Sequence, residues 1–180
     1  ACRSFAIFLK IMKKILLLVA FAGMLGTSVR VSAQTSSNAV EFERVTVTDA
    51  TNMRSKPKVT AESSLPAAKI KFKDLVMGKG DAATPASSVT VQYVGVRYAD
   101  GKQFDSSWEK GGPISFRLNK VVKGFTQGIG GNDSIPPMKV GGRRLMILPS
   151  ELAYGERGTL DGSIQPNDTI VFVVDLIAVK

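Results

Sequence analysis

The chain has no histidine among its 180 residues and only one cysteine, Cys2. Because hydrolysis of the Ser-His-Asp or Cys-His type requires an imidazole, those mechanisms are excluded, as is histidine-based metal hydrolysis. Cys2 precedes the start that we expect at Met12, so the mature protein would have neither a disulfide nor a thiolate metal site. An enzyme built from this chain has to work without the usual nucleophile and base.

Long apolar runs are also scarce. Residues 15–25 form a run of eleven that follows Met12–Lys14 and precedes the small residues Val31–Ala33. A membrane-spanning helix needs about 20 apolar residues, so this run is typical of a secretory signal that is cleaved before Gln34. An uncleaved membrane anchor, lengthened by the apolar cluster 5–9, is the alternative. We expect residues 1–33 to be an N-terminal extension and signal peptide. The mature protein is then secreted or periplasmic in a bacterium, without a stable membrane span.

The positive charge is not concentrated anywhere. The net charge of +9 falls to +4 when residues 1–33, with their five basic residues and no acid, are removed. Only Arg143 and Arg144 are then adjacent basic residues. Proteins that bind nucleic acid usually show a basic patch or stripe, and none is present, so a nucleic-acid partner is not expected.

The residues after the signal divide into two regions. Gln34–Ala68 is rich in Ser, Thr, Ala and charged residues and is interrupted by Pro57 and Pro66. This composition predicts a flexible spacer with one short strand at Val45–Thr48. A core-like pattern begins at Lys69, and residues 69–180 are the predicted globular domain. Because every candidate site residue named below lies in that domain, we expect it to fold and to be active without the spacer.

Apolar residues alternate in several short segments of the domain, which predicts β-strands. These strands are expected around Ile70–Phe72, Val89–Tyr93, Ile114–Leu118, Arg143–Leu148 and Thr169–Val179. The last segment is apolar on both faces and should be a central, buried strand. Val121–Ile129 is the best place for a helix, although Gly124 and Gly128 lower its helix propensity. The sequence alone therefore predicts a mostly antiparallel β domain of about 110 residues.

The stretch YADGKQFDSSWEKGGPISF, residues 98–116, carries the most informative chemistry. Asp100-Gly101 predicts a tight turn, and Phe104 and Asp105 then place an acid next to a large ring. A carboxylate among apolar rings is costly unless it is hydrogen-bonded or paired with a cation. Lys110 and Arg117 are both near in sequence, and the sequence does not decide between them.

Four stretches together resemble the FKBP-type peptidyl-prolyl isomerases: VTVQYVGVRYADGKQFDSS, VVKGFTQGI, IPPMKVGGRRLMILPSELAYGERG and IQPNDTIVFVVDL. The resemblance covers roughly Lys69–Lys180. It implies an α+β fold, in which a curled antiparallel sheet of about five strands wraps around one short helix near Val121–Ile129. It also implies catalysis of X-Pro bond rotation without a cofactor or metal. Proline-containing polypeptides are the implied substrates, and macrolides of the tacrolimus type are implied ligands.

The family's pocket maps onto matching positions of this chain. The resemblance implies catalytic roles for Asp105 and Tyr154. It implies substrate binding by Tyr93, Phe104, Ile114, Val121, Val122, Phe125, Ile164 and Phe172. Phe125 stands at the floor position, where many members have tryptophan, and Ile114 stands where the wall is often aromatic. Phe116 and Leu145 are interpreted as core residues and Trp108 as a residue that covers a loop. Residues 130–137 look like an insertion relative to the shortest members.

Such a pocket needs no bond-breaking chemistry. The barrier to X-Pro rotation is about 18–20 kcal/mol and reflects charge-separated amide resonance. An apolar pocket solvates that resonance form less well than water does, while Tyr154 can fix the substrate carbonyl and Asp105 can order the polar edge. Two functions remain open at this point. One is an isomerase for exported folding proteins, and the other is a slow or non-catalytic proline-binding chaperone module.

Overall fold

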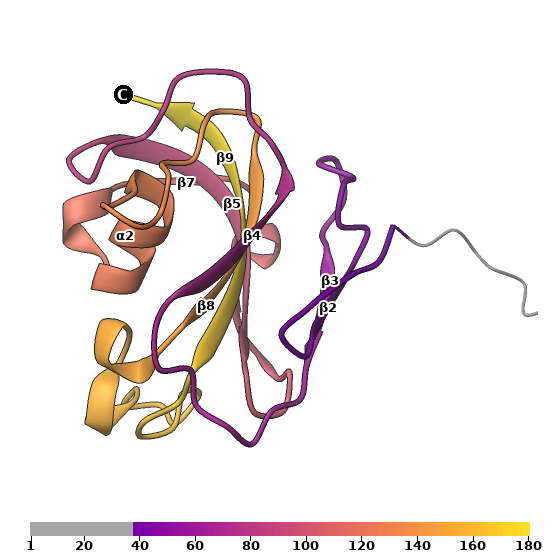
Figure 1. Ribbon diagram of the computed structural model, residues 1–180, viewed down its shortest axis with the longest axis vertical. Helices are drawn as coiled ribbons and strands as arrows, with labels where there is room; N and C mark the ends of the chain where they lie inside the picture. Colours follow the sequence, from indigo (N-terminus) through magenta and orange to yellow (C-terminus); the bar gives the residue numbers. More distant parts are fainter. Residues whose placement is uncertain (1–37) are drawn as a thin grey trace, which may run out of the picture. The chain divides into compact units, whose positions relative to one another are not determined.

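The structure is a computed structural model that describes residues 38–180, and the predicted signal peptide lies outside these residues. Two antiparallel sheets and one α-helix make up the described part (Figure 1). The three-stranded N-terminal sheet consists of β1 (Val40–Phe42), β2 (Val45–Thr48) and β3 (Lys58–Ala61). The six strands of the main sheet are β4 (Lys71–Val76), β5 (Ser88–Arg97), β6 (Gln103–Ser106), β7 (Ile114–Arg117), β8 (Arg143–Leu148) and β9 (Ile170–Val179).

Helical segments are short. The α-helix α2 spans Lys123–Gly130. The 3-10 turns are η1 (Ser107–Glu109), η2 (Leu118–Lys120), η3 (Ser150–Leu152) and η4 (Gly155–Arg157). No helix within residues 38–180 has the length and apolar character to cross a bilayer.

The main sheet has the strand order β4-β8-β9-β5-β6, and β7 pairs with β5 as well. Every pairing is antiparallel, and β9 lies between β8 and β5, as its two apolar faces predict. The turn at Asp100-Gly101 is confirmed, because Gly101 has a φ of +68° and its N–H donates to the Arg97 carbonyl at 2.9 Å. The curled sheet around one helix confirms the expected fold class. The short strand β6 brings the main sheet to six strands, one more than expected.

Helix α2 lies across one face of the main sheet, here called the inner face (Figure 1). Its glycines explain why propensity is a poor guide to this segment. A Cβ at Gly128 would come within 2.3 Å of the Met146 sulfur, and one at Gly124 within 3.1 Å of the Leu148 side chain. The two glycines weaken the helix locally but let it approach β8 closely. The helix begins two residues later than the sequence predicts.

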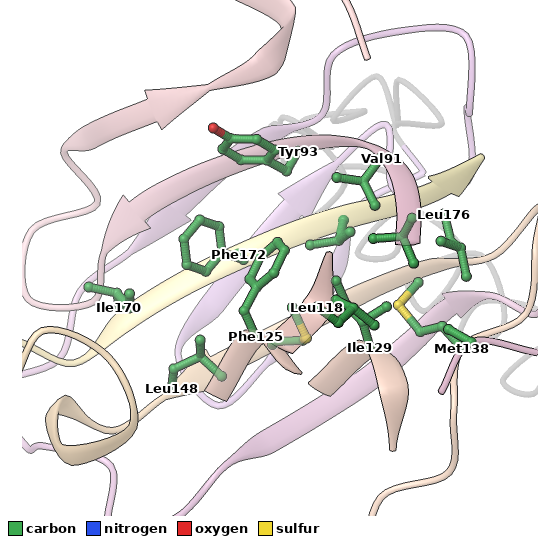
Figure 2. Close-up of a cluster of buried hydrophobic side chains, with 14 of the residues drawn as sticks. Val91, Tyr93, Leu118, Phe125, Ile129, Met138, Leu148, Ile170, Phe172 and Leu176 are labelled. Carbon is green, nitrogen blue, oxygen red and sulfur yellow. The ribbon is translucent and has the colours of Figure 1, made fainter. Parts of the chain in front are cut away.

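The main core fills the space between the inner face and α2. Figure 2 shows Phe125 and Ile129 from α2 against Phe172 and Leu176 from β9. All four side chains are at least nine-tenths buried. Tyr93 lies at the edge of this cluster, and its hydroxyl points away from the other side chains (Figure 2). The Tyr93 hydroxyl is therefore a polar group at the edge of an otherwise apolar core, where it can form hydrogen bonds.

The opposite, outer face of the main sheet is apolar too, and the N-terminal sheet covers it. Seven of its side chains form one buried cluster with five from the N-terminal segment. The seven are Val94, Val96, Tyr98, Leu145, Ile147, Val171 and Val173, and the five are Val45, Val47, Ala50, Val59 and Ala61. Figure 1 shows β2 and β3 on the side of the main sheet away from α2.

The flexible spacer that the sequence predicts over Gln34–Ala68 is thus a folded layer from residue 38 onward. The predicted strand at Val45–Thr48 is confirmed as β2, but β1 and β3 were not expected. These strands have only three or four residues, and threonines alternate with the buried valines, so their composition looks like that of a linker. Burial against the outer face supplies the stability that such short strands lack by themselves.

Two arginines at the start of β8 connect the main sheet to its two covers, α2 on the inner face and the N-terminal sheet on the outer face. Arg144 faces α2, and its guanidinium donates to the carbonyls of Gly128 and Pro136 at 2.9 and 2.7 Å. The same guanidinium pairs with Asp74 of β4 at 2.7 Å. Arg143 faces the N-terminal sheet and pairs with Asp175. Both side chains are almost fully buried, and each has the several partners that a buried charge requires. The contact with Pro136 also fixes the segment that follows α2.

Candidate active site

A cavity of about 580 Å³ opens on the inner face at the edge of the main core. Strands β5, β6, β7 and β9 contribute one side of it, and the residues around α2 contribute the other. Its lining residues are Tyr93, Asp105, Ile114, Phe116, Lys120, Val121, Val122, Phe125, Tyr154 and Phe172. Most of these side chains are apolar, and only a few polar groups reach the cavity, which is usual for a small-molecule or peptide pocket.

Aromatic rings build the deep end of the cavity. Phe125 and Phe172 meet nearly edge to face, with ring centroids 5.0 Å apart, and Tyr93 contacts Phe172 in the same way at 5.9 Å. Phe116 adds a ring 5.8 Å from Phe125. Edge-to-face contacts are favourable because the positive ring edge meets the negative ring face. The rings therefore hold one another in place and present a rigid apolar wall.

Asp105 is the charged group at the rim of this wall. Its Oδ2 accepts a hydrogen bond from the Tyr93 hydroxyl at 2.6 Å, and its Oδ1 lies 2.6 Å from the Lys110 ammonium. The Ser106 N–H also donates to Oδ1 at 2.7 Å. The cation that pairs with Asp105 is thus Lys110 and not Arg117. Burial by itself would raise the pKa of Asp105, but the bonds from Lys110 and Tyr93 outweigh it, and the pKa lies below the usual 3.8. The carboxylate is ionised at neutral pH.

Two tyrosine hydroxyls face the same region as hydrogen-bond donors. Burial, together with the hydrogen bond to Asp105, raises the pKa of Tyr93 far above the usual 10. Burial and the nearby Asp105 charge also raise the pKa of Tyr154. Both hydroxyls therefore keep their protons at physiological pH. Tyr154 is 38% exposed, and within residues 38–180 its hydroxyl makes no hydrogen bond, so it is available to a ligand.

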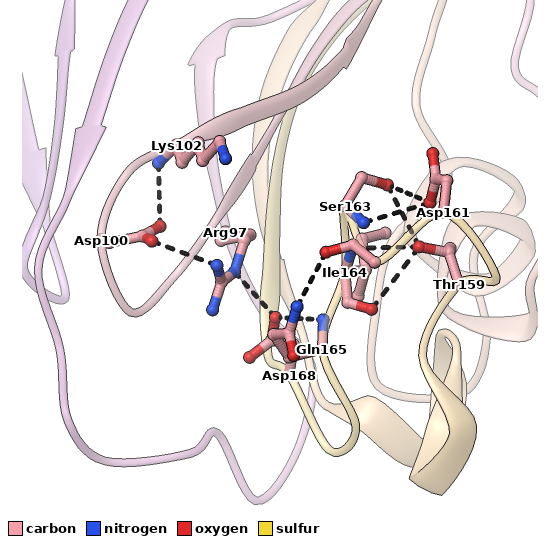
Figure 3. A network of polar contacts seen from close by, with 10 residues as sticks. Arg97, Asp100, Lys102, Thr159, Asp161, Ser163, Ile164, Gln165 and Asp168 are labelled. Carbon is pink, nitrogen blue, oxygen red and sulfur yellow. Dashed lines mark hydrogen bonds and ion pairs between the residues drawn. The ribbon is translucent and has the colours of Figure 1, made fainter.

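The loop that follows Tyr154 is fixed by the polar network in Figure 3. Asp161 accepts hydrogen bonds from the Ser163 hydroxyl at 2.8 Å and from its N–H at 3.1 Å. Hydrogen bonds from Thr159 and Ser163 lower the pKa of Asp161 to about 2. Asp168 joins the loop to β5, because its carboxylate accepts from Arg97 at 2.8 Å and from the Gln165 N–H at 2.7 Å. Asp161 acts here as a turn-forming residue, as its Asp-Gly sequence predicts.

The structure brings most of the predicted site residues together. Eight of them line the cavity: Tyr93, Asp105, Ile114, Val121, Val122, Phe125, Tyr154 and Phe172. Phe104 and Ile164 do not. Phe104 packs edge to face against Phe172, with ring centroids 5.5 Å apart, and Ile164 is 2% exposed within the main core. In this structure these two side chains pack against residues of the main core.

Two lining residues were missed by sequence reasoning. Phe116 was interpreted as core, but it lines the cavity and packs against the core at once. Its position two residues after Ile114 on β7 puts both side chains on the same face, and this alternation is the signal that could have found it. Lys120 lies in η2, where no strand or helix pattern applies, and no sequence signal marks it. None of the residues 130–137, which were expected to be an insertion, lines this cavity.

Comparisons with known proteins agree with this geometry. The model of the FKBP-type peptidyl-prolyl cis-trans isomerase family matches residues 79–177. The FK506-binding protein of Streptomyces anulatus is 44% identical over 126 residues, which are 69% of this chain and 97% of that protein. The crystal structure of AtFKBP13 matches with a TM-score of 0.58 at 40% identity and covers 66% of this chain and 98% of that chain.

FkpA from Escherichia coli matches with a TM-score of 0.55 at 38% identity and covers 67% of this chain. The match extends over 51% of the FkpA chain, so about half of that protein has a counterpart here. The likeness to the Streptomyces protein, in contrast, extends over almost the whole relative. From these matches and the geometry of the cavity, the chain belongs to the FKBP-type peptidyl-prolyl cis-trans isomerase family and is an isomerase of X-Pro bonds.

Proposed function

We propose that the cavity rotates X-Pro bonds of exported, folding polypeptides by removing the amide from water and by orienting a few hydrogen bonds. The observation that carries this proposal is the placement of one ionised carboxylate and two protonated tyrosines at the rim of an aromatic cavity. Rotation breaks no bond, so no nucleophile or metal is required. An acceleration of about 10²–10⁵ corresponds to a barrier lowered by only about 3–7 kcal/mol.

The aromatic wall supplies the desolvation in this proposal. The planar amide is stabilised by charge separation, which water solvates well and the edges of Phe125 and Phe172 solvate poorly. A proline ring that packs against this wall leaves its preceding peptide bond in the same apolar surroundings. The twisted amide has less charge separation than the planar one, and so the cavity favours the twisted form.

The polar rim supplies the orientation. Tyr154 has a free hydroxyl and is proposed to donate to a substrate carbonyl. Asp105 already accepts from Tyr93, Lys110 and Ser106, so its proposed role is electrostatic: it fixes the Tyr93 hydroxyl and sets the potential at the rim. Such preorganised groups act without moving during the reaction, which is the usual source of electrostatic catalysis.

The same cavity is proposed to bind macrolides of the tacrolimus type. The Streptomyces anulatus relative is named for binding FK506, and the lining here offers a large apolar wall with donors at one edge. A macrolide that occupies the cavity should compete with proline peptides. This competition provides an independent way to show that catalysis takes place in this cavity.

The test is a cis-trans isomerisation assay on a proline tetrapeptide, with and without FK506. We expect catalysis above the uncatalysed rate, which has a time constant of tens of seconds, and inhibition by FK506. The alternative, a slow proline-binding chaperone module, predicts peptide binding and FK506 competition without rapid turnover. Phe125 at the floor and Ile114 at the wall are the residues that would favour this alternative. Turnover that FK506 does not inhibit would place the catalytic site elsewhere.

Export is a separate part of the proposal and rests on residues 1–33. We expect mass spectrometry of the protein made in a bacterial host to find a mature chain that starts at Gln34. An intact segment 12–33 in the membrane fraction would support the anchor alternative instead. The isomerase proposal stands in either case, since all cavity residues lie after residue 90.

A further inference from the structure

The N-terminal sheet lies outside the segment that the family model matches, residues 79–177, but it is joined firmly to that segment. Arg143 donates to the carbonyls of Asp49 at 2.9 Å and of Ser55 at 3.3 Å while it pairs with Asp175. The Tyr98 hydroxyl donates to the Glu43 carbonyl at 2.8 Å. Together with the buried valine-rich cluster, these bonds give the sheet a fixed position on the outer face.

Strand β3 runs beside the hairpin that leads to the active site. The Ser63 N–H donates to the Tyr98 carbonyl at 3.2 Å. A Cβ at Gly101, in the β5–β6 turn, would come within 2.9 Å of the Ala61 nitrogen. The hairpin and β3 are thus in direct backbone contact. Because β6 begins two residues after Gly101 and carries Asp105, the N-terminal sheet contacts the element that presents the catalytic carboxylate.

A second contact reaches the residues just after Asp105. The Lys56 ammonium pairs with the Glu109 carboxylate in η1, and Glu109 also accepts from the Gln103 amide at 2.9 Å. Trp108, the only tryptophan of the chain, packs against the outer-face cluster. Its indole N–H is buried without a hydrogen-bond partner within residues 38–180, so apolar packing alone holds the ring.

The turn η1 separates the two members of the ion pair at the cavity rim. Asp105 precedes the turn and Lys110 follows it, and their side chains meet at 2.6 Å. The Lys110 side chain is 57% exposed, so solvent competes for it, and the path of η1 determines whether it stays within reach of Asp105. Ser107 is fully buried and accepts from the Tyr93 N–H at 2.8 Å, which ties the turn to β5 as well.

We infer that the N-terminal sheet positions the active site, and that Lys56, Glu109 and Trp108 are positioning residues that hold η1 so that Lys110 pairs with Asp105. This inference rests on the proposed role of Asp105 in the reaction. None of the three residues lines the cavity, so they act on catalysis through Asp105 and Lys110. A small displacement of an oriented group is enough to slow a reaction that depends on geometry.

The chain offers a matched control for this inference. Lys71 and Glu43 form a second ion pair between the main and N-terminal sheets, with N–O distance 2.7 Å. The two lysine side chains are similarly exposed, Lys56 at 37% and Lys71 at 35%. The variants K56M and K71M therefore remove equal charge and similar contacts. Only K56M removes a contact to η1.

The first experiment compares these two variants with the full mature chain as reference. We expect K56M to lower kcat for a proline tetrapeptide by about threefold to tenfold with KM little changed, and K71M to change neither by more than about 1.5-fold. We expect the emission of Trp108 to shift to the red in K56M alone. Both variants should unfold at nearly the same temperature, because exposed ion pairs contribute little to stability. Equal kinetics in the two variants would overturn the inference.

The second experiment separates this inference from the proposed role of Asp105. The K56M effect is measured again in a D105N background, where we expect it to disappear because the two changes act on the same ion pair. The charge-swapped double variant K56E/E109K should regain most of the lost kcat. If D105N slows the reaction but K56M does not, the inference is wrong and the role of Asp105 stands. If D105N itself has no effect, both are wrong.

Discussion

On its inner face the main sheet carries large aromatic rings and a cavity, whereas on its outer face it carries mostly valine, leucine and isoleucine beneath the N-terminal sheet. The difference arises within single strands. In β9, Phe172 points to the cavity and the adjacent Val173 points to the N-terminal sheet. The rings pack edge to face and leave the cavity at their rim, whereas the small β-branched side chains of the outer face pack against the valines of the N-terminal sheet. One face is therefore suited to bind and the other to stabilise.

The largest effect is expected when the cover of the outer face is removed. A fragment of residues 69–180 contains all cavity residues, and from the sequence alone it was expected to fold and to be active. In the structure it would expose seven buried side chains, each worth about 1.5–3 kcal/mol, against a total domain stability of about 5–15 kcal/mol. We now expect the fragment to be largely unfolded or aggregated by circular dichroism and size-exclusion chromatography.

A fragment that folds with normal activity would show that the outer face tolerates water and that the two faces are independent. A fragment that folds but is slow would support the positioning role of the N-terminal sheet. The matched control is residues 38–180, which keep the cover and should have the full stability and activity of the mature protein.

A smaller effect, confined to stability, is expected for a substitution that creates a void in the outer-face cluster. Leu145 is fully buried there and does not line the candidate active site. Leu145→Ala should lower the free energy of unfolding by about 2–5 kcal/mol, through lost burial and the void left behind. The kcat/KM of the folded protein should be unchanged when it is measured well below the melting temperature. A large loss of kcat/KM in folded protein would show that the outer face shapes the cavity directly.

The polar rim is expected to contribute less. Asp105→Asn keeps the shape of the side chain and an acceptor for Tyr93 but loses the charge, and Tyr154→Phe deletes one hydroxyl. Each should cost about 1–3 kcal/mol of transition-state stabilisation, the scale of a lost hydrogen bond, with kcat/KM as the measurement. A loss of many orders of magnitude would indicate covalent or proton-transfer chemistry, which the proposed mechanism does not contain.

The smallest effect is expected from pH. The pKa of Asp105 is lowered, and those of Tyr93 and Tyr154 are raised, so none of the three titrates near neutrality. The catalysed rate should be flat from about pH 6 to 8. A carboxyl with a lowered folded pKa contributes stability that is fully present above its unfolded pKa, near 3.8, and is lost as the pH falls through the folded value. A bell-shaped profile near neutrality in folded protein would contradict this assignment.

The comparison of the two faces also shows what the sequence could and could not reveal. The apolar pattern of Thr169–Val179 predicted a central strand buried on both sides, and the structure confirms this for residues 170–176 of β9. Two buried faces require two covers, but the sequence indicated only one, the helix near Val121–Ile129. The second cover, Val40–Ala61, has strands too short and too rich in threonine to be told from a linker by composition. Its stability comes from contacts that are distant in sequence.

The candidate active site was predicted mainly through the family motifs. Asp105 and Tyr154 came from their motifs, and the structure places both at the cavity. The pairing of Asp105 with Lys110 could not be predicted, because Arg117 is also near in sequence and only the path of η1 selects between them. Likewise, nothing local shows that Phe104 packs against Phe172, because the two rings lie on strands that are distant in sequence.

The central claim, that one face of the sheet catalyses and the other stabilises, is tested most directly by two neighbouring residues of β9. Phe172→Leu and Val173→Ala each remove buried apolar atoms, and both should lower the melting temperature. The decisive measurement is kcat/KM for a proline tetrapeptide at a temperature where both variants are fully folded. We expect Phe172→Leu to lose about tenfold or more, because it removes a ring from the cavity wall, and Val173→Ala to stay within about twofold of the parent protein. Equal losses in the two variants would contradict the account.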